Sequence, residues 1–363
     1  MIYLDYQATT PIAPEVRDAM APWMGEKFAN PHAPYRAGRE AAVAIEIARS
    51  QVMEALGHSE GTLAFTGSAT ESLNWAIRGV LPDDRRAHIV TLATEHAAVL
   101  DTIHHAGRRH DVTVVPVEGD GRVDLDRLKS ALRPDTALVA AMLVNNEIGV
   151  IQPVAEITAI AHAAGARMLC DAVQGLGRVP IPDGPDMIAV CAHKIHGPKM
   201  VGALWMAKGV TPAPLLHGGG QEKGLRSGTL SPALCTGFGA AAQLARRRFE
   251  QDRAHIAALW ETGRTILADW TLNGSIEHRY RGNLNLRLDG LDAARLLAEN
   301  RDIAFSLGSA CASGSGRPSH VLKALGLSDR EAKSSIRLGF GRYTDANAFA
   351  DALRRLDGSA KSQ

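Results

Sequence analysis

Two charged side chains in the middle of the chain are placed where they could carry out chemistry together. Asp171 directly follows the apolar run Met168–Cys170, and Lys194 follows the apolar run Met187–Cys191. Because functional groups in an α/β sheet gather at the carboxyl ends of its strands, both side chains are expected at one edge of a sheet. A partly desolvated lysine amine at such an edge can form a Schiff base with a carbonyl compound. A single lysine at a strand end is more often only solvated, so this interpretation depends on its neighbours.

A run of small and hydroxyl-bearing residues, Thr66–Ser72, follows another predicted strand and precedes a helical pattern. Free backbone N–H groups and the helix dipole at such a helix start attract an anion, above all a phosphate. An ordinary Ser/Thr helix cap is the alternative for this run alone. A Schiff-base lysine, a carboxylate for a pyridinium nitrogen and a phosphate loop are together what a pyridoxal phosphate enzyme requires.

One of the four cysteines stands in a setting that suits a nucleophile. Cys311 lies within the stretch 308–316, whose other residues are glycine, serine and alanine. This composition predicts a mobile and reachable thiol, with a harmless loop cysteine as the alternative. Cys170 and Cys191 lie in apolar runs and are predicted to be buried, and Cys235 lies in a helical pattern.

These side chains need a sheet to position them, and the chain up to about residue 245 alternates short apolar runs with helical patterns. Several runs are continuously apolar, as expected for strands that are covered on both faces. The alternation predicts a mainly parallel sheet flanked by helices, one of them a long helix at Gly38–Gly57. The strands are predicted at Thr62–Thr66, His88–Leu92, Val112–Val117, Ala137–Val144, Arg167–Cys170, Met187–Cys191 and Val201–Met206.

The last third of the chain has a different pattern, which predicts a smaller α+β domain. A length of 363 residues, against roughly 150 per domain, predicts about two domains, with a boundary near residues 246–253. The C-terminal helices are predicted at His255–Asp269 and Asp292–Asn300, and the strands at Asn283–Leu288, Ile303–Ser306 and Ser335–Gly339.

The overall composition excludes several classes of protein. A formal net charge of +1 argues against a nucleic-acid-binding surface or a polybasic membrane anchor. The longest apolar run, Ala137–Val144, is far shorter than a membrane span, and no secretory signal follows Met1. Four scattered cysteines do not make a disulfide framework, so a reduced, cytoplasmic protein is expected.

The motifs are spread over almost the whole chain and occur in the order found in one enzyme family. They are Tyr3–Pro11, Asn30-Pro31, Phe65–Ser72, Glu95–Leu100, Asn145–Gly149, Asp171–Gln174, His193-Lys194, Gly218–Glu222, Arg226–Thr229, Gly308–Cys311, Pro318–Gly326 and Ser335–Arg342. On these motifs the chain resembles the cysteine desulfurases of the NifS/IscS type, which are pyridoxal phosphate enzymes of fold type I in aminotransferase class V. The resemblance implies a mainly parallel seven-stranded sheet in a large domain at residues 15–246. It also implies a smaller α+β domain, made of residues 1–14 and 247–363, that carries the Cys311 loop.

The resemblance also implies which residues hold pyridoxal 5'-phosphate. Lys194 would bind the cofactor covalently, and Asp171 would stabilise the protonated pyridine nitrogen. His96 would stack on the ring and assist proton transfer. The remaining cofactor contacts are implied at Ala69, Thr70 and His193 for the phosphate, at Cys191 near it, at Asn146 and Gln174 for the ring hydroxyl, and at Thr229 for the phosphate of a neighbouring subunit.

The reaction implied by the resemblance removes sulfur from L-cysteine and leaves L-alanine. Arg337, helped by Asn30, would hold the substrate carboxylate through a bidentate contact. Lys194 would move the α-proton, and the Cys311 thiolate would attack the substrate sulfur and carry it as a persulfide. The loop after Cys311 is similar to the longer loop of the NifS/IscS group, which implies delivery to an iron–sulfur scaffold or another acceptor protein. Cys311 would also be a transient ligand of a [2Fe-2S] cluster on the acceptor side, and the protein would be a homodimer.

Three features depart from the family pattern. Tyr35 stands where the family usually has histidine, and Cys191 replaces a serine, which implies a weaker contact to the cofactor phosphate. The chain also ends soon after Arg342, without the C-terminal extension that helps IscS-type members contact scaffolds. A selenocysteine lyase, a class V aminotransferase and a non-catalytic sulfur-trafficking subunit are the alternatives, and the aminotransferase would not need Cys311.

Overall fold

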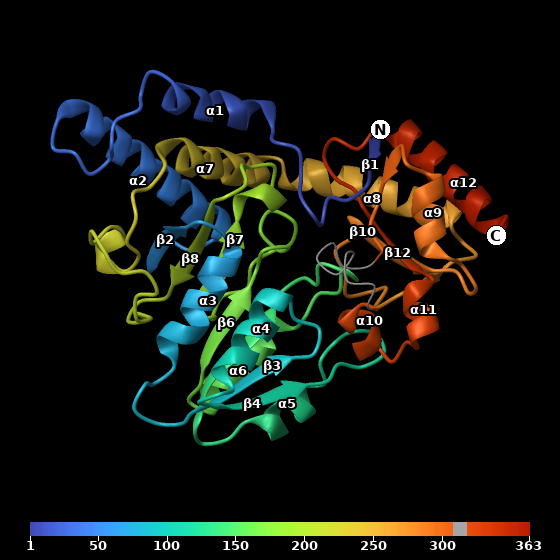
Figure 1. The fold of residues 1–363 in the computed structure, drawn as a ribbon, viewed down its shortest axis with the longest axis horizontal. Coiled ribbons are helices and arrows are strands. Elements are labelled where there is room, and N and C mark those ends of the chain that lie inside the picture. The colour runs from blue at the N-terminus through green and yellow to red at the C-terminus, as the bar shows by residue number, and fades with distance from the viewer. Residues whose placement is uncertain (308–317) are drawn as a thin grey trace.

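A seven-stranded sheet forms the centre of the larger part of the molecule in the computed structural model, which describes residues 1–307 and 318–363 (Figure 1). The strand order is β2-β8-β7-β6-β5-β3-β4, and β8 alone runs against the others. The predicted mainly parallel sheet is therefore confirmed. Its strands are β2 (Thr62–Thr66), β3 (His88–Leu92), β4 (Asp111–Val115), β5 (Thr136–Met142), β6 (Arg167–Asp171), β7 (Met187–Cys191) and β8 (Gly202–Met206).

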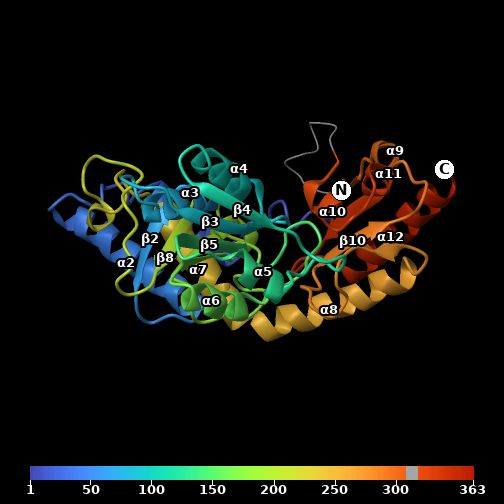
Figure 2. The ribbon, with the colours of Figure 1, turned by 90° about the horizontal axis from the view of Figure 1, so that it is seen from below.

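Helices cover both faces of this sheet, which is why its strands are apolar throughout (Figure 2). One face packs against α3 (Ala69–Val80) and α4 (Ala97–Ala106). The helices packed on the opposite face are α1 (Pro14–Met24), α2 (Arg36–Leu56), α5 (Leu125–Ala131), α6 (Val154–Ala163) and α7 (Pro232–Arg247). Cys170, Cys191 and Cys235 all lie in these buried layers, so the predicted burial of the first two is confirmed.

Local signals fix where two of these helices begin or end. The long helix predicted at Gly38–Gly57 is α2, which ends at Leu56 and is followed by the capping residue Gly57, whose φ of 81° suits a residue without a Cβ. Asp124 caps α5, because its carboxylate accepts hydrogen bonds from the N–H groups of Asp126 and Arg127.

The strand predicted at Ala137–Val144 is shorter at its carboxyl end than the apolar run suggested. β5 ends at Met142, and Val144 instead forms an isolated bridge with Ile151. The N–H of Leu143 still donates to the carbonyl of Asp171 on the neighbouring strand, and the chain leaves the sheet after this residue.

The C-terminal part is built on a three-stranded antiparallel sheet in the order β12-β10-β9. Its strands are β9 (Thr271–Leu272), β10 (Asn283–Arg287) and β12 (Ser335–Gly339). Its helices are α8 (Phe249–Ile266), α9 (Ala293–Glu299), α10 (His320–Ala324), α11 (Asp329–Lys333) and α12 (Ala346–Lys361). No helix among the described residues is long and apolar enough to span a membrane.

The first residues of the chain join this C-terminal part. The short strand β1 (Ile2–Tyr3) pairs in parallel with β11 (Ile303–Ala304), and Asp5 bridges to Gly339 at the end of β12. The N-terminal segment thus runs from the C-terminal part back to the large sheet, and on its way it passes the carboxyl ends of β6 and β7 (Figure 1).

Candidate active site

A cavity of about 620 Å³ opens at the carboxyl ends of the central strands. This volume is in the range of small-molecule and cofactor sites. It is enclosed by loops that follow the strands of the large sheet and by the C-terminal part, since Arg337, Pro318 and His320 also line it. The predicted site residues that line it are Ala69, Thr70, His96, Asn146, Asp171, Gln174, Cys191, His193, Lys194 and Arg337.

Lys194 ends the short 3₁₀ helix η1 (Ala192–Lys194) that follows β7, and its side chain points back to the N-terminal segment. Its Nζ donates hydrogen bonds to the carbonyls of Gln7, at 2.5 Å, and Ala8, at 2.8 Å. Burial lowers the pKa of Lys194 to about 8, with the Arg178 and Arg337 charges acting in the same direction. A lysine with this pKa has a much larger fraction of the neutral, nucleophilic amine near neutral pH than an ordinary lysine.

Asp171 is the last residue of β6, and its carboxylate accepts a hydrogen bond from the N–H of Val173 at 3.0 Å. Burial raises the pKa of Asp171, while His96 and Lys194 act to lower it. A carboxylate held at this depth is suited to pair with a cationic group that enters the cavity.

A second acid lies behind Asp171 and was not singled out from the sequence. Glu95 is fully buried, and its Oε1 accepts from the N–H of Met142 at 2.8 Å, while its Oε2 has no hydrogen-bond partner among the described residues. Burial raises the pKa of Glu95 well above its ordinary value, and the nearby Asp171 carboxylate raises it further. Both effects favour the neutral form of this acid.

The N-terminus of α3 forms the anion-attracting wall of the cavity. Ser68 caps the helix by accepting from the N–H of Glu71, and Ala69 and Thr70 in the first turn line the cavity. The first N–H groups of a helix have no acceptor within the helix, so they are available to a phosphate. Position 202 on β8 must be glycine here, because a Cβ would lie 2.6 Å from the carbonyl carbon of Ser68.

Two histidines flank this wall. His96 is the N-cap of α4, and its Nδ1 accepts from the N–H of Ala98 at 3.0 Å, which assigns the ring proton to Nε2. His193 is hydrogen-bonded to the hydroxyl of Thr9 at 3.2 Å. Burial lowers the pKa of His193 to about 4, with Lys194 adding to the effect, so this ring is neutral and acts through hydrogen bonds.

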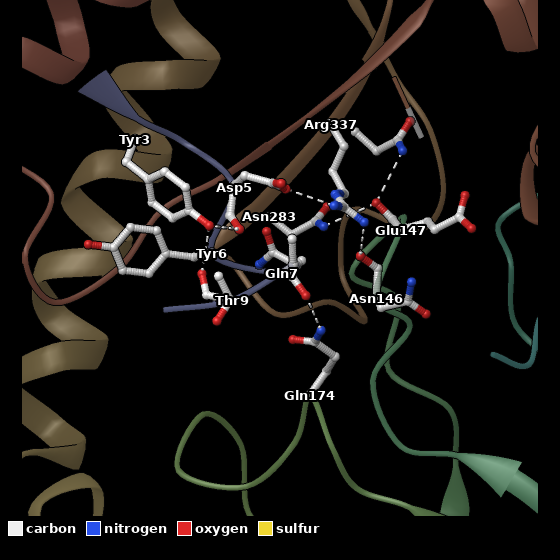
Figure 3. Close-up of polar contacts among 12 residues, drawn as sticks. Tyr3, Asp5, Tyr6, Gln7, Thr9, Asn146, Glu147, Gln174, Asn283 and Arg337 are labelled. Carbon is white, nitrogen blue, oxygen red and sulfur yellow. Dashed lines mark hydrogen bonds and ion pairs between the residues drawn. The ribbon is translucent and has the colours of Figure 1, made fainter. Parts of the chain in front are cut away.

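Arg337 on β12 forms the opposite wall, and its side chain is 1% exposed. Its Nη2 pairs with the carboxylate of Asp5 at 2.8 Å, and its Nη1 donates to the carbonyl of Asn146 at 3.1 Å (Figure 3). Its Nε has no partner among residues 1–307 and 318–363, so the guanidinium, with five N–H groups, keeps donors for a carboxylate in the cavity. Burial raises the pKa of Asp5, and Arg337 opposes this effect.

The loop after β5 is fixed so that Asn146 faces Arg337. Asn145 accepts from the N–H groups of Glu147 and Ile148, which forms a tight turn, and its amide donates to the carbonyl of Thr94. The amide of Asn283, on β10, donates to the carbonyl of Glu147 at 3.0 Å (Figure 3). Thr94, Asn283 and Arg337, which come from three separate parts of the chain, thus hold this loop.

Gln174 and Cys191 complete the cavity wall. The amide nitrogen of Gln174 donates to the carbonyl of Gln7 at 2.9 Å (Figure 3). The side-chain oxygen of Gln174 accepts from Arg178. Burial raises the pKa of Cys191 to about 11, which keeps its side chain a neutral thiol. A neutral thiol is a weak hydrogen-bond donor, in agreement with the weak phosphate contact expected at this position.

Three residues singled out from the sequence lie away from this cavity. Asn30 is exposed, and its Oδ1 accepts from the N–H of His32 at 2.9 Å rather than reaching the cavity. Thr229 is also exposed and does not line the cavity. Tyr35 precedes α2 and is 56% exposed.

Cys311 lies outside the described residues. The next residue that the structure describes is Pro318, and it lies in the cavity wall. Pro318 and His320 line the cavity, and the hydroxyl of Ser319 is hydrogen-bonded to the carboxylate of Glu147. At roughly 3.5 Å per residue, the chain from Cys311 to Pro318 spans at most about 25 Å. Among the described residues, no group of three His, Cys, Asp or Glu side chains could hold a metal ion.

Gln7, Glu147 and His320 also line the cavity, although the sequence analysis assigned them no role. Gln7 and Glu147 fall inside motifs quoted for the family resemblance, and this is the signal that could have pointed to them. His320 is bound to the carbonyl of Glu95 at 2.9 Å, a contact that spans the two parts of the molecule.

The sequence and the fold of the whole chain are similar to those of known proteins. Residues 2–350 match the family described as Aminotransferase class-V. A protein named Cysteine desulfurase IscS from Rickettsia bellii is 42% identical over 368 residues, which cover 98% of this chain and 90% of the relative. A solved structure titled NIFS-LIKE PROTEIN matches with a TM-score of 0.93 at 31% identity and covers 100% of both chains. A structure titled SspA in complex with cysteine matches with a TM-score of 0.85 at 33% identity and covers 95% of this chain and 100% of its own.

Proposed function

The chain belongs to the aminotransferase class-V family and is a pyridoxal phosphate-dependent cysteine desulfurase, and we propose that Lys194, Asp171, His96 and Cys311 carry its reaction. The observation that carries the proposal is that one cavity gathers Lys194, Asp171, the start of α3 and Arg337. These groups are, in order, an amine of lowered pKa, a buried carboxylate, an anion-attracting helix terminus and a guanidinium with free donors. Each suits one part of the cofactor or of an amino acid substrate.

The donor set of the cavity fits pyridoxal phosphate. Lys194 would hold the cofactor covalently through its amine, and Asp171 would keep a proton on the pyridine nitrogen. Asn146 and Gln174 would reach the ring hydroxyl, and His96 would stack on the ring. The phosphate would be held by Ala69, Thr70, His193 and, weakly, Cys191. When bound, the cofactor supplies a protonated ring that takes up the electron pair released at the substrate α-carbon.

The substrate L-cysteine would be oriented by Arg337. Two of the five guanidinium N–H groups are used by Asp5 and Asn146, and those that remain can hold the substrate carboxylate. The incoming substrate would displace Lys194 from the cofactor, and the freed Lys194 amine would then remove the α-proton, for which a pKa near 8 is well matched. Asn30 does not line the cavity of its own chain. It would therefore join Arg337 only by reaching the cavity of a neighbouring subunit.

Sulfur transfer is proposed for Cys311. Its thiolate would form a bond to the sulfur of the substrate, and the carbon–sulfur bond would break with its electron pair remaining on carbon. Protonation of that carbon gives L-alanine, and Cys311 is left as a persulfide. The position of Pro318 in the cavity wall supports this role, since it keeps Cys311 within a bounded length of chain from the substrate.

The protein is proposed to work as a homodimer in the cytoplasm and to pass its sulfur to an iron–sulfur scaffold or another acceptor protein. The exposed position of Thr229 supports a dimer, because the residue would then reach the cofactor phosphate of a neighbouring subunit. On the acceptor side, the Cys311 persulfide would transiently ligate a [2Fe-2S] cluster.

The test is turnover of L-cysteine by the purified protein loaded with pyridoxal phosphate. Alanine and sulfide are expected in equal amounts when a reducing thiol is present. Cys311→Ser is expected to keep the cofactor absorbance but to form no persulfide that mass spectrometry can detect. Release of a keto acid in place of alanine, or full turnover by Cys311→Ser, would overturn the assignment.

A further inference from the structure

A guanidinium group that does not line the main cavity contacts the main chain of Lys194. Arg178 belongs to the loop that follows β6, and its Nη2 donates to the main-chain carbonyl of Lys194 at 2.7 Å. Its Nη1 donates to the side-chain oxygen of Gln174, and the group stacks over the ring of Tyr280 at 5.2 Å. The same Nη2 lies 3.4 Å from the carbonyl of Tyr6. Arg178 thus joins two cavity residues that are twenty positions apart in the chain.

Like the buried Arg279, this cation has no carboxylate paired with it among the described residues. Among residues 1–307 and 318–363, no aspartate or glutamate lies within ion-pair distance of Arg178. Burial lowers the pKa of Arg178, which the nearby Tyr280 and Cys191 only partly offset. Placing a charge in a desolvated position without a counter-ion destabilises a fold, so Arg178 is expected to have a functional role that offsets this cost.

That role concerns Lys194, whose amine lies near both positively and negatively charged groups. Asp5 from the N-terminal segment and Cys191 from the end of β7 favour its charged form, and Arg337 on β12 and Arg178 disfavour it. Asp171 at the end of β6 and His193 beside it in η1 are the other titratable groups coupled to it. Of the two nearby cations, Arg337 is paired with Asp5, whereas Arg178 has no ion-pair partner in the part of the chain that the structure describes.

We propose that Arg178 is a positioning residue for Lys194: its charge keeps the Lys194 amine available in neutral form, and its two N–H groups fix Gln174 and the Lys194 main chain in one arrangement. The inference rests on the proposed role of Lys194 and deepens it. A lysine at position 178 would keep the charge but lose the forked contact, whereas a neutral side chain would lose both.

The experiment measures how readily Lys194 reacts with acetic anhydride as a function of pH. The full-length, cofactor-free protein is labelled between pH 6 and 10, and the extent of Lys194 acetylation is quantified by peptide mass spectrometry. In the wild type the midpoint is expected near 8. Arg178→Gln is expected to raise this midpoint by about half a pH unit or more, because removing a like charge favours the protonated amine. Lys194 would then react about threefold more slowly at pH 7.

Three variants serve as controls. Arg178→Lys is expected to keep the midpoint near the wild-type value, which separates the effect of charge from that of shape. Arg167→Gln removes an arginine from the opposite end of β6, where it pairs with Asp186, and is expected to leave the midpoint unchanged. Arg178→Met serves as the second neutral variant if Arg178→Gln does not fold, as judged by circular dichroism.

The inference is overturned if a folded neutral variant titrates at the wild-type midpoint, or if Lys194 in the wild type titrates like an exposed lysine, near 10.4. Because the labelling uses protein without cofactor, its outcome is independent of turnover. A shifted midpoint in a chain that releases no alanine would retain the role of Arg178 and reject the desulfurase assignment. Normal turnover with unshifted midpoints would reject the role of Arg178 and retain the desulfurase assignment.

Discussion

Replacing Gly202 by alanine tests whether the start of α3 is the phosphate cradle. Gly202 is the first residue of β8, and a Cβ there would lie 2.6 Å from the carbonyl carbon of Ser68 and 2.8 Å from the nitrogen of Ala69. Both are backbone atoms, which cannot rotate out of the way. An ordinary contact begins at 3.4 Å, so the first turn of α3 must move away from the sheet by about 0.8 Å.

The expected magnitude follows from the cost of overpacking. Forcing an extra methyl group into a packed interior costs about 1–3 kcal/mol. If that displacement falls on the N–H groups that receive the phosphate, the affinity for pyridoxal phosphate falls about tenfold or more, because 1.4 kcal/mol corresponds to a factor of ten. The melting temperature of the cofactor-free protein is expected to fall as well.

The assay is an absorbance titration of the cofactor-free protein with pyridoxal phosphate. The matched control is Gly358→Ala in α12, where an added Cβ meets nothing within 4 Å and affinity is expected to be unchanged. A Gly202→Ala protein that binds the cofactor as tightly as the wild type would refute the assignment of the α3 terminus as the phosphate site.

Three further predictions concern the cavity walls. Asp171→Asn is expected to retain bound cofactor but to lower kcat for alanine formation about 100-fold or more, because no carboxylate then holds the ring proton. Arg337→Gln is expected to raise KM for L-cysteine about tenfold to 100-fold through loss of charge-assisted hydrogen bonds, with the cofactor absorbance unchanged. Burial raises the pKa of Glu95, so the stability it contributes is complete below its unfolded pKa of about 4.3 and is lost as pH rises through its higher folded value. Glu95→Gln is therefore expected to reduce the fall in melting temperature between pH 5 and pH 9.

Each of these predictions has an outcome that contradicts it. Normal turnover by Asp171→Asn would place the ring nitrogen elsewhere in the cavity. An unchanged KM in Arg337→Gln would assign substrate recognition to another group. A melting temperature that varies with pH in the same way for Glu95→Gln and the wild type would show that Glu95 does not ionise in this range.

The parts of the site that could be predicted from the sequence are those whose signal is local. Asp171 and Lys194 each follow an apolar run, and such a run marks the strand that ends beside the cavity. Ser68 precedes a helical pattern at cap spacing, which marks the start of α3. The predicted strand bounds were wrong where an apolar run continues past the end of the strand, as it does from Met142 to Val144.

The parts that could not be predicted depend on contacts between distant segments. The ion pair of Arg337 with Asp5 joins the two ends of the chain, and neither residue carries a local signal for the other. The contact of Arg178 with the carbonyl of Lys194 depends on how two loops pack. Glu95 looks like an ordinary polar residue in a loop until the fold buries it.

The pairing of the first residues with the last strands has a consequence for biosynthesis. Gln7 and Ala8 emerge from the ribosome long before Arg337, yet Arg337 must be synthesised before the cavity that they share is closed. The large sheet can assemble while translation continues, since its strands end at Met206. Cofactor capture is therefore expected only after Arg337 has emerged, so a chain terminated before this residue would have an assembled sheet but an open cavity.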